Sequence, residues 1–214
     1  MSQICHDLHH LFNSLPVFGW PFDAQKIPHN GIYVLFEVAE VAHGANRIVR
    51  IGTHTGDGKL RSRLEEHFVR ENKDRSIFRR NIGRAILRRD HDPFLAQWDL
   101  DLTTRASRQK HAASVDFVRQ RRVEQLVTAY MQSHFRFVVF RVDDKDRRLD
   151  WESKMISTVS LCDECGPSPS WLGQFSPTER IRLSGLWLTN ELYKQPLSES
   201  EYRALEGAIR RMWG

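Results

Sequence analysis

Residues 31–67 combine two strand-like apolar runs, a tight turn between them and a helix-like segment directly afterwards. The first run, 31–40, is rich in β-branched and aromatic residues, and the second, 47–52, has the length of a short strand. The turn at 43–46 contains glycine and asparagine. This arrangement predicts an antiparallel hairpin followed by a helix from about residue 59 to residue 70.

The remaining patterns place this hairpin in an α+β fold. A strand pattern at 135–142 and a helical pattern at 147–161 predict a third strand and a covering helix. We therefore expect one domain over 1–214, with a small antiparallel or mixed three-stranded sheet flanked by helices. The expected divisions are a core at 30–68 and 134–160, a basic helical insertion at 69–133 and a C-terminal helical extension at 166–214.

The positive charge of the chain is concentrated in its centre. The net charge is +5, yet residues 59–122 contain 17 Lys and Arg against 9 Asp and Glu, and the rest of the chain contains 15 against 18. Such clustering predicts a polyanionic partner, of which nucleic acid is the commonest. The same segment contains Phe78, Phe94 and Trp98. These aromatic residues either stack on bases or pack in the core, and core packing is the more frequent role.

The predicted helix at 59–70 carries two candidate functional side chains. Leu60, Leu64 and Phe68 form its apolar stripe, and Arg63 and His67 border that stripe at a spacing of four residues. A solvated arginine would favour the opposite side of the helix. We therefore expect Arg63 and His67 to follow the surface onto which the helix packs, either in a functional site or at a helix–sheet seam.

Glu152 is the second unusual position. It lies between Leu149 and Ile156 on the apolar stripe of the helix at 147–161. A carboxylate that faces a core is costly unless a cation, a metal ion or several hydrogen bonds compensate its charge. Arg63 or a divalent metal ion would meet that need, because hard cations prefer oxygen ligands.

The order of these features resembles the motif order of the GIY-YIG nuclease superfamily, which includes homing endonucleases, some restriction enzymes and the incision domain of bacterial nucleotide-excision repair. The matching residues are Gly31-Ile32-Tyr33, Arg50-Ile51-Gly52, Arg63-Leu64-Glu65-Glu66-His67 and Glu152. The resemblance implies a metal-dependent endonuclease that hydrolyses phosphodiester bonds. DNA is a more expected substrate than RNA. A nucleic-acid-binding module without catalysis on the same scaffold is the alternative.

The resemblance also implies a role for each matched residue. Tyr33 would activate or position the attacking water, and Arg63 would bind the scissile phosphate. His67 would share the proton network, and Glu152 would bind a single Mg²⁺ or Mn²⁺ ion. These roles agree with the chemistry, because hydrolysis needs a deprotonated nucleophile and cations on the phosphate oxygens.

The sequence departs from the family pattern in two places. Arg50 replaces the tyrosine of the second motif and is a candidate phosphate ligand. The asparagine that often supports the site late in the domain has no secure equivalent; Asn190 and Ser170 are the candidates. A Gly-Thr-His segment and a Ser-Ile-Phe-Arg segment resemble a subgroup of the family. On that basis four further residues are expected to face the substrate: His54, Arg75, Arg79 and Arg80.

Cysteine content and hydropathy indicate in which cellular compartment the chain is expected. Three cysteines give no disulfide framework, and the sequence has neither a signal-peptide pattern nor a long apolar run, so we expect a cytoplasmic protein without membrane contact. Cys162 and Cys165 have zinc-ligand spacing, which Cys5 and His9 would complete as a tetrahedral set; free thiols are the commoner interpretation. Cutting both strands of a duplex with one site per chain would require a homodimer or successive nicks.

Overall fold

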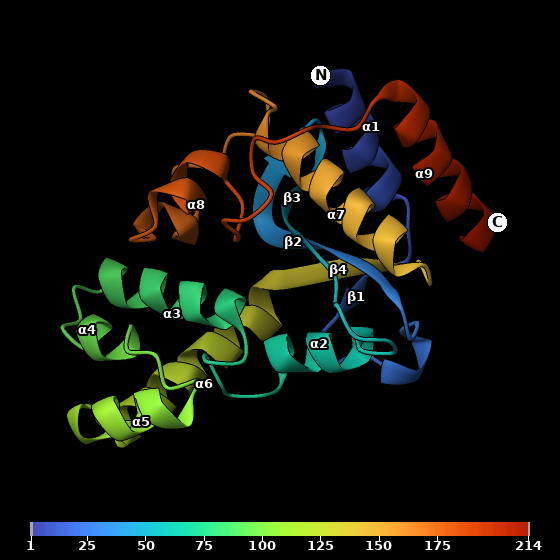
Figure 1. Ribbon diagram of the computed structural model, residues 1–214. Coiled ribbons are helices and arrows are strands. Elements are labelled where there is room, and N and C mark those ends of the chain that lie inside the picture. Colours follow the sequence, from blue (N-terminus) through green and yellow to red (C-terminus); the bar gives the residue numbers. More distant parts are fainter. Residues whose placement is uncertain (1, 214) are drawn as a thin grey trace.

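The structure is a computed structural model that describes residues 2–213. Its centre is a four-stranded antiparallel sheet in the order β1-β4-β2-β3 (Figure 1). The strands are β1 (Phe18–Gly19), β2 (Gly31–Ala42), β3 (Ala45–Gly52) and β4 (Phe135–Arg141). The α+β class and the hairpin are confirmed, but the sheet has four strands where we expected three. The additional strand, β1, is only two residues long, so it carries no periodic pattern.

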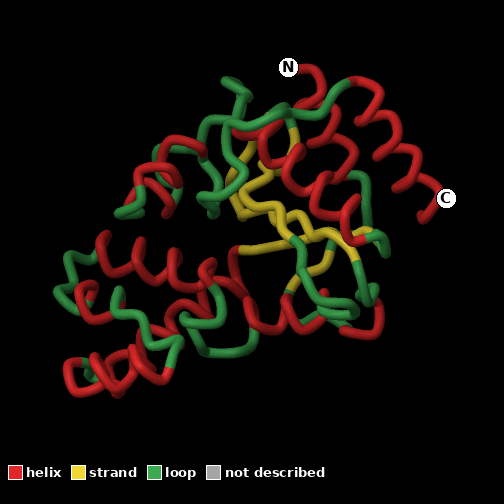
Figure 2. The backbone as a smooth tube through the Cα atoms, in the orientation of Figure 1, coloured by secondary structure: helices red, strands yellow, loops and turns green. Residues whose placement is uncertain are grey.

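Helices cover both faces of the sheet (Figure 2). One layer contains α1 (Ser2–Asn13), α7 (Lys145–Ser160) and α9 (Glu199–Trp213), and the other contains α2 (Leu60–Phe68), α3 (Ile77–Arg89) and α6 (Phe117–His134). The shorter helices are α4 (Leu95–Trp98), α5 (Arg105–His111), α8 (Glu179–Ser184) and the 3-10 turns η1 (Ala24–Lys26), η2 (Ala112–Ser114) and η3 (Leu172–Phe175). Among the described residues, no helix is both long and apolar enough to span a membrane.

The two layers follow from strand alternation in β2. Ile32 and Val34 pack with the α1, α7 and α9 layer, whereas Tyr33 and Leu35 pack with the α2, α3 and α6 layer. Each layer forms its own hydrophobic cluster, so the sheet is buried on both sides. The faces of β2 therefore determine which side chains can reach the Arg63 helix.

The basic segment contributes to the core of the second layer. Phe78, Phe94 and Trp98 are all buried and belong to the same apolar cluster as Tyr33. Of the two roles considered for these aromatic residues, packing is therefore the one that the structure supports. Gly83 is needed for this packing, because a Cβ atom there would lie 2.4 Å from the Trp98 ring.

A buried carboxylate ties the C-terminal third of the chain to the sheet. Glu37 accepts hydrogen bonds from the indole nitrogens of Trp171 and Trp187, each at 2.7 Å, and from the hydroxyl of Tyr130 in α6. Glu37 lies where β2 bulges away from β3, between the paired residues Phe36 and Val41. Three donors from distant segments thus meet at one residue of the central strand.

A second buried group strengthens the same attachment. Arg47 of β3 pairs with Glu40 at 2.6 Å and donates to the Gly185 carbonyl at 2.6 Å. Glu40 also accepts from the backbone N–H of Ser168 at 3.1 Å. The loop at 166–170 and the end of α8 are therefore held against the hairpin by charged hydrogen bonds.

We predict that Glu37→Ala lowers the free energy of unfolding by at least about 3 kcal/mol, because it leaves three buried donors without an acceptor. Chemical denaturation monitored by tryptophan fluorescence measures this change. Glu65→Ala, which removes an exposed carboxylate paired with Arg70, is the control and should change stability by less than about 1 kcal/mol. Equal effects of the two substitutions would contradict the anchoring role of Glu37.

Candidate active site

A cleft with a volume of about 510 Å³ lies between β3, α2, α3, α7 and the segment that follows α8. Its lining comprises Arg50, Ile51, Arg63, Ile77, Asn81, Leu149, Glu152, Ser153, Ile156 and residues 188–191. A second hollow of about 360 Å³ shares Arg63, Leu149 and Glu152 with the first. Arg63 and Glu152 therefore stand at the junction of the two hollows, although 89 residues separate them in the chain.

Glu152 reaches the cleft because of its position on α7. Leu149 and Ile156 share its side of the helix and line the same cleft, as their helical spacing predicts. Burial raises the pKa of Glu152 to about 6. The positive charge of Arg50 and a hydrogen bond from the Thr53 backbone limit this rise. Glu152 is thus a carboxylate whose negative charge is only partly compensated within the protein.

Arg63 approaches Glu152 from the opposite wall. It lies on α2, and its side chain is 25% exposed. One guanidinium nitrogen, Nη1, donates to Glu66 at 2.9 Å and to the Arg75 carbonyl at 3.1 Å. Within the described part of the chain, Nε and Nη2 have no hydrogen-bond partner. Two donors of a fixed guanidinium therefore remain available to an anion in the cleft.

Arg50 faces the same cleft from β3. A bulge leaves Val49 as the extra residue between the Phe36–Ile48 and Leu35–Arg50 pairs. Arg50 lies on the regular side of this bulge: its pairing with Leu35 continues the register of Tyr33 with Gly52, so it faces the α2 and α3 layer as Tyr33 and Leu35 do. There Arg50 lies 4.9 Å from the Phe78 ring centre, and its guanidinium donates to the carbonyl of Trp187.

Tyr33 and His67 lie directly behind Arg50. The Tyr33 hydroxyl is 2.8 Å from Nε2 of His67 and 3.4 Å from Nε of Arg50, and Nδ1 of His67 is 2.8 Å from the Ser76 hydroxyl. Gly52 leaves room for the phenol, because a Cβ atom there would lie 2.3 Å from its oxygen. The glycine of the second motif is therefore a steric requirement of the Tyr33 position.

The pKa of His67 is well below its usual range because the ring is fully buried and Arg63, Arg50 and Arg79 lie nearby. A neutral imidazole has one donor and one acceptor nitrogen. When Nδ1–H donates to Ser76, Nε2 accepts the hydrogen bond of the Tyr33 hydroxyl. Tyr33, His67 and Ser76 then form a continuous chain of proton donors and acceptors.

We expected Tyr33, Arg63, His67 and Glu152 to line one cleft, and the structure divides them into two layers. Arg63 and Glu152 line the cleft, whereas Tyr33 and His67 are fully buried one side chain behind it. Arg50 touches both layers. The spacing of the residues predicted which face of each helix or strand they occupy. It could not predict how deeply Tyr33 and His67 are buried.

The four residues expected from the resemblance to a subgroup of the family, His54, Arg75, Arg79 and Arg80, have different environments. Arg75 is exposed next to Arg63, and Arg80 donates to the carbonyls of Asp99 and Leu100 and pairs with Asp74. His54 lines the second hollow, but both of its ring nitrogens bond the backbone, to Gly31 N–H at 3.3 Å and to Gly56 C=O at 2.5 Å. Burial lowers the pKa of His54, so the ring braces the loop as a neutral group.

Arg79 does not face the cleft, which corrects the expectation that it contacts a substrate. It is fully buried, pairs with Glu124 at 2.7 Å and donates to the His67 carbonyl at 2.8 Å. The sequence contained the signal for this position, because Arg79 shares the helical spacing of Ile82 and Ile86, which are also buried. Arg79 therefore positions His67 from behind.

Two asparagines also line the cleft, and one of them was expected. Asn190, one of the two candidates for the late supporting asparagine, is among the lining residues, whereas Ser170 is exposed and bonds Ser168. Asn81 of α3 is buried at the cleft wall, and sequence analysis missed it. Its helical spacing from Phe78 and Ala85, which are both buried, was the available signal.

Comparison with protein-family models matches residues 9–213 to the GIY-YIG domain. Searches of curated proteins and of solved structures gave no match. The matched range includes every residue that lines the cleft, together with the Tyr33–His67 pair behind it.

We predict that Glu152→Gln stabilises the metal-free protein at pH 8. The folded-state pKa of about 6 is above the ordinary value of 4.5, so the folded chain binds more protons than the unfolded chain between these values. Stability is therefore lost as the pH rises through this window, and a neutral glutamine avoids a loss of order 1–2 kcal/mol. Urea unfolding at pH 8 and pH 4 measures the difference, which should disappear at pH 4.

Asp150→Asn is the matched control for this substitution, because Asp150 lies on the same helix but is exposed and paired with Lys154 at 2.8 Å. It should not stabilise the protein at pH 8. A lower stability of Glu152→Gln at that pH would show that the ionised carboxylate is compensated within the fold.

Proposed function

The chain belongs to the GIY-YIG domain family, a family of endonucleases, and we propose that it hydrolyses DNA phosphodiester bonds in the cleft between Arg63 and Glu152. The observation that carries this proposal is the meeting of an arginine with free donors and a carboxylate with a raised pKa across one cleft. A phosphodiester needs a cation for its oxygens and an activated water on the opposite side of the phosphorus. The two walls of the cleft would provide these groups.

Arg63 and Arg50 would bind the phosphate. Both line the cleft, and the free guanidinium nitrogens of Arg63 suit two phosphate oxygens at once. The charge on those oxygens increases as water attacks, so an arginine fixed beforehand stabilises the transition state more than the ground state. Arg50 thus takes a phosphate-binding role at the position where the family motif has tyrosine.

Glu152 would bind one Mg²⁺ or Mn²⁺ ion. The cleft offers oxygen ligands from Glu152 and from the Asn190 side chain, whereas both carboxylate oxygens of Glu191 are already bonded, to Ser153 and Lys194. Hard divalent ions accept one carboxylate with waters in the remaining positions. The raised pKa of Glu152 fits this role, because an added cation would compensate its charge. When bound, such an ion acidifies water and neutralises charge on the phosphate.

The Tyr33–His67 pair would receive the proton of the attacking water. Tyr33 would take that proton on its oxygen while passing its own to Nε2 of His67. Arg50 would have to move aside for the water to reach the Tyr33 hydroxyl, which is buried behind it. As the new P–O bond forms, the P–O ester bond would break, and the leaving alkoxide would take a proton from solvent. Two of the three arginines that lower the pKa of His67, Arg63 and Arg50, are the ones expected to bind phosphate. Bound phosphate would offset their charge and so make His67 a better base.

The basic surface beside the cleft would hold the rest of the DNA. Several cations of 59–122 are neutralised by acids, as in the pairs of Arg70 with Glu65 and Arg84 with Asp99. Lys59 lines the second hollow, Arg75 adjoins Arg63, and Arg75 and Arg108 line a further groove of about 380 Å³. These cations would contact the phosphate backbone of the DNA that extends beyond the cleft.

We predict that the purified chain nicks supercoiled plasmid with Mg²⁺ or Mn²⁺, and that Glu152→Ala and Arg63→Ala each reduce the rate at least about a hundredfold. Each substitution removes a side chain that would act on the reacting phosphate, either directly or through the metal ion. Gel electrophoresis of plasmid over time measures the rate. Asp150→Asn and Arg203→Ala, which change exposed charges elsewhere on α7 and α9, should nick at the wild-type rate.

Binding measured in parallel distinguishes catalysis from the non-catalytic alternative, which Arg50 at the tyrosine position favours. DNA binding that weakens steeply with salt but never leads to nicking would replace the enzyme with a binding module. Nicking by the wild type that survives in Glu152→Ala would instead assign the chemistry to another site.

We predict that Tyr33→Phe lowers the nicking rate constant by about 10²–10⁴ while leaving DNA affinity unchanged. The phenylalanine keeps the ring of a fully buried residue and removes only the hydroxyl that contacts His67. Single-turnover cleavage and fluorescence anisotropy measure the two quantities. A full rate in Tyr33→Phe would mean that Tyr33 is a packing residue and that another group accepts the proton.

A further inference from the structure

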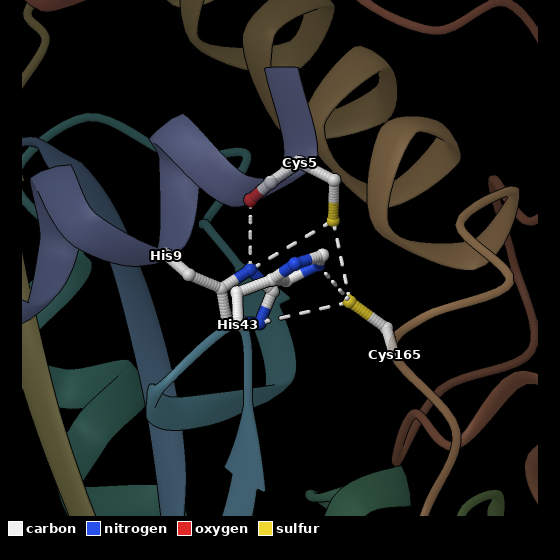
Figure 3. A group of neighbouring side chains, drawn as sticks. All are labelled: Cys5, His9, His43 and Cys165. Carbon is white, nitrogen blue, oxygen red and sulfur yellow. Dashed lines mark hydrogen bonds between the residues drawn. The ribbon is translucent and has the colours of Figure 1, made fainter. Parts of the chain in front are cut away.

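Cys5, His9, His43 and Cys165 form a cluster on the face of the sheet opposite the Tyr33–His67 pair (Figure 3). Cys5 and His9 lie on α1, His43 lies in the turn between β2 and β3, and Cys165 lies in the loop after α7. One ligand atom from each residue lies within 4.8 Å of the others. Four chemically similar donors from three distant segments therefore converge on one point.

The spacing of these atoms is close to that of a tetrahedral metal site. Zinc bonds of about 2.3 Å to sulfur and about 2.0–2.1 Å to nitrogen require ligand atoms about 3.3–3.8 Å apart. The Cys165 sulfur is 3.3 Å from the Cys5 sulfur, 3.1 Å from Nε2 of His43 and 3.9 Å from Nε2 of His9. These three separations are within a few tenths of an ångström of the required range, and the other pairs of ligand atoms lie within 4.8 Å.

The second nitrogen of each histidine is already oriented by a partner. Nδ1 of His43 lies 3.5 Å from the Glu164 carboxylate, and Nδ1 of His9 donates to the Cys5 carbonyl at 2.8 Å. Metal-binding histidines are held in the same way, by a carboxylate or carbonyl on the other nitrogen. Both imidazoles therefore present Nε2 to the Cys165 sulfur, while the Cys5 sulfur lies 3.7 Å from Nδ1 of His9. Nε2 of His9 also accepts from Ile48 N–H at 3.2 Å, a bond that metal binding would replace.

The two cysteines are placed to bind one ion together. Their sulfur atoms are 3.3 Å apart, and both residues are buried and free of disulfide bonds. Cysteine binds a metal ion as the thiolate, so an ion at this point would release the thiol protons and compensate the charge of the buried sulfur atoms.

We propose that Cys5, His9, His43 and Cys165 bind one structural Zn²⁺ ion. Sulfur and imidazole ligands select zinc over Mg²⁺ and Mn²⁺, and four protein ligands leave no open position for a substrate. The ion would connect α1, the hairpin turn and the C-terminal end of α7. Glu152 lies about 12 Å along α7 from its last residue, Ser160, so the zinc site is separate from the cleft. The proposal does not depend on the nuclease proposal.

Cys162 is the alternative fourth ligand and provides a control. Its sulfur lies 3.5 Å from Nε2 of His43, but Cys162 is more exposed than Cys5 or Cys165. We assign the fourth position to His9 because its ligand atom belongs to the compact group and that of Cys162 does not. Cys162→Ser should therefore retain zinc, as should His10→Asn, which changes an exposed histidine adjacent to His9.

The test is the metal content of the full chain, purified without chelator and measured by plasma mass spectrometry. We expect one zinc per chain in the wild type, and no zinc above the buffer level in His43→Ala or Cys165→Ser. Because these variants could fail to fold, the wild type is also dialysed against a chelator. Its Tm should fall, and Zn²⁺ but not Mg²⁺ should restore it. Co²⁺ added to the metal-free chain should give the visible spectrum of a tetrahedral thiolate site.

Three results would overturn the proposal or its ligand assignment. A zinc-free wild type whose Tm does not respond to added Zn²⁺ would remove the site. An intact mass lower by two hydrogen atoms, without zinc, would mean that Cys5 and Cys165 form a disulfide instead. If Cys162→Ser loses zinc and His9→Gln retains it, the fourth ligand is Cys162 and not His9.

Discussion

The buried carboxylate of Glu37 determines where the C-terminal third of the chain lies. By accepting hydrogen bonds from Trp171, Trp187 and Tyr130, it joins the segment after α7 to the central strand and to α6. Trp187 is further paired with β3, because its N–H donates to the Val49 carbonyl at 2.7 Å and its carbonyl accepts from Arg50. The next four residues, 188–191, form one wall of the cleft. The cleft is therefore completed by a segment that Glu37 anchors together with hydrogen bonds from β3.

The cleft itself combines groups that a stable fold would avoid. Glu152 lies on an apolar helix stripe with a raised pKa, Arg63 keeps unpaired donors, and His67 is buried as a neutral ring among arginines. Each arrangement costs folding free energy that the two apolar layers must supply. Such concentrations of perturbed ionisable groups are characteristic of functional sites. Arg50 joins this concentration because it pairs with Leu35 and therefore faces the Tyr33 side of the sheet.

Local patterns predicted the parts of the fold that they encode directly. The hairpin, α2 and α7 have strong periodicity, and the position of Glu152 within the stripe of α7 predicted that it faces the interior. β1 escaped prediction because a two-residue strand has no period, and the burial of Arg79 escaped because a motif resemblance outweighed its helical spacing. The depth of Tyr33 and His67 behind Arg50 depends on how α2 and α3 pack over the sheet, which no local pattern encodes. The arrival of Asn190 at the cleft depends on Glu37, more than 150 residues earlier.

In the proposed mechanism, the phosphate to be cut lies between Arg63 and Glu152. The most direct measurement is a crystal structure of the Tyr33→Phe chain with a short DNA duplex and Mn²⁺, in which anomalous scattering locates the metal. We expect one phosphate within hydrogen-bond distance of the Arg63 guanidinium and a Mn²⁺ ion on the Glu152 carboxylate. A duplex bound over another face, with neither phosphate nor Mn²⁺ in the cleft, would contradict the account.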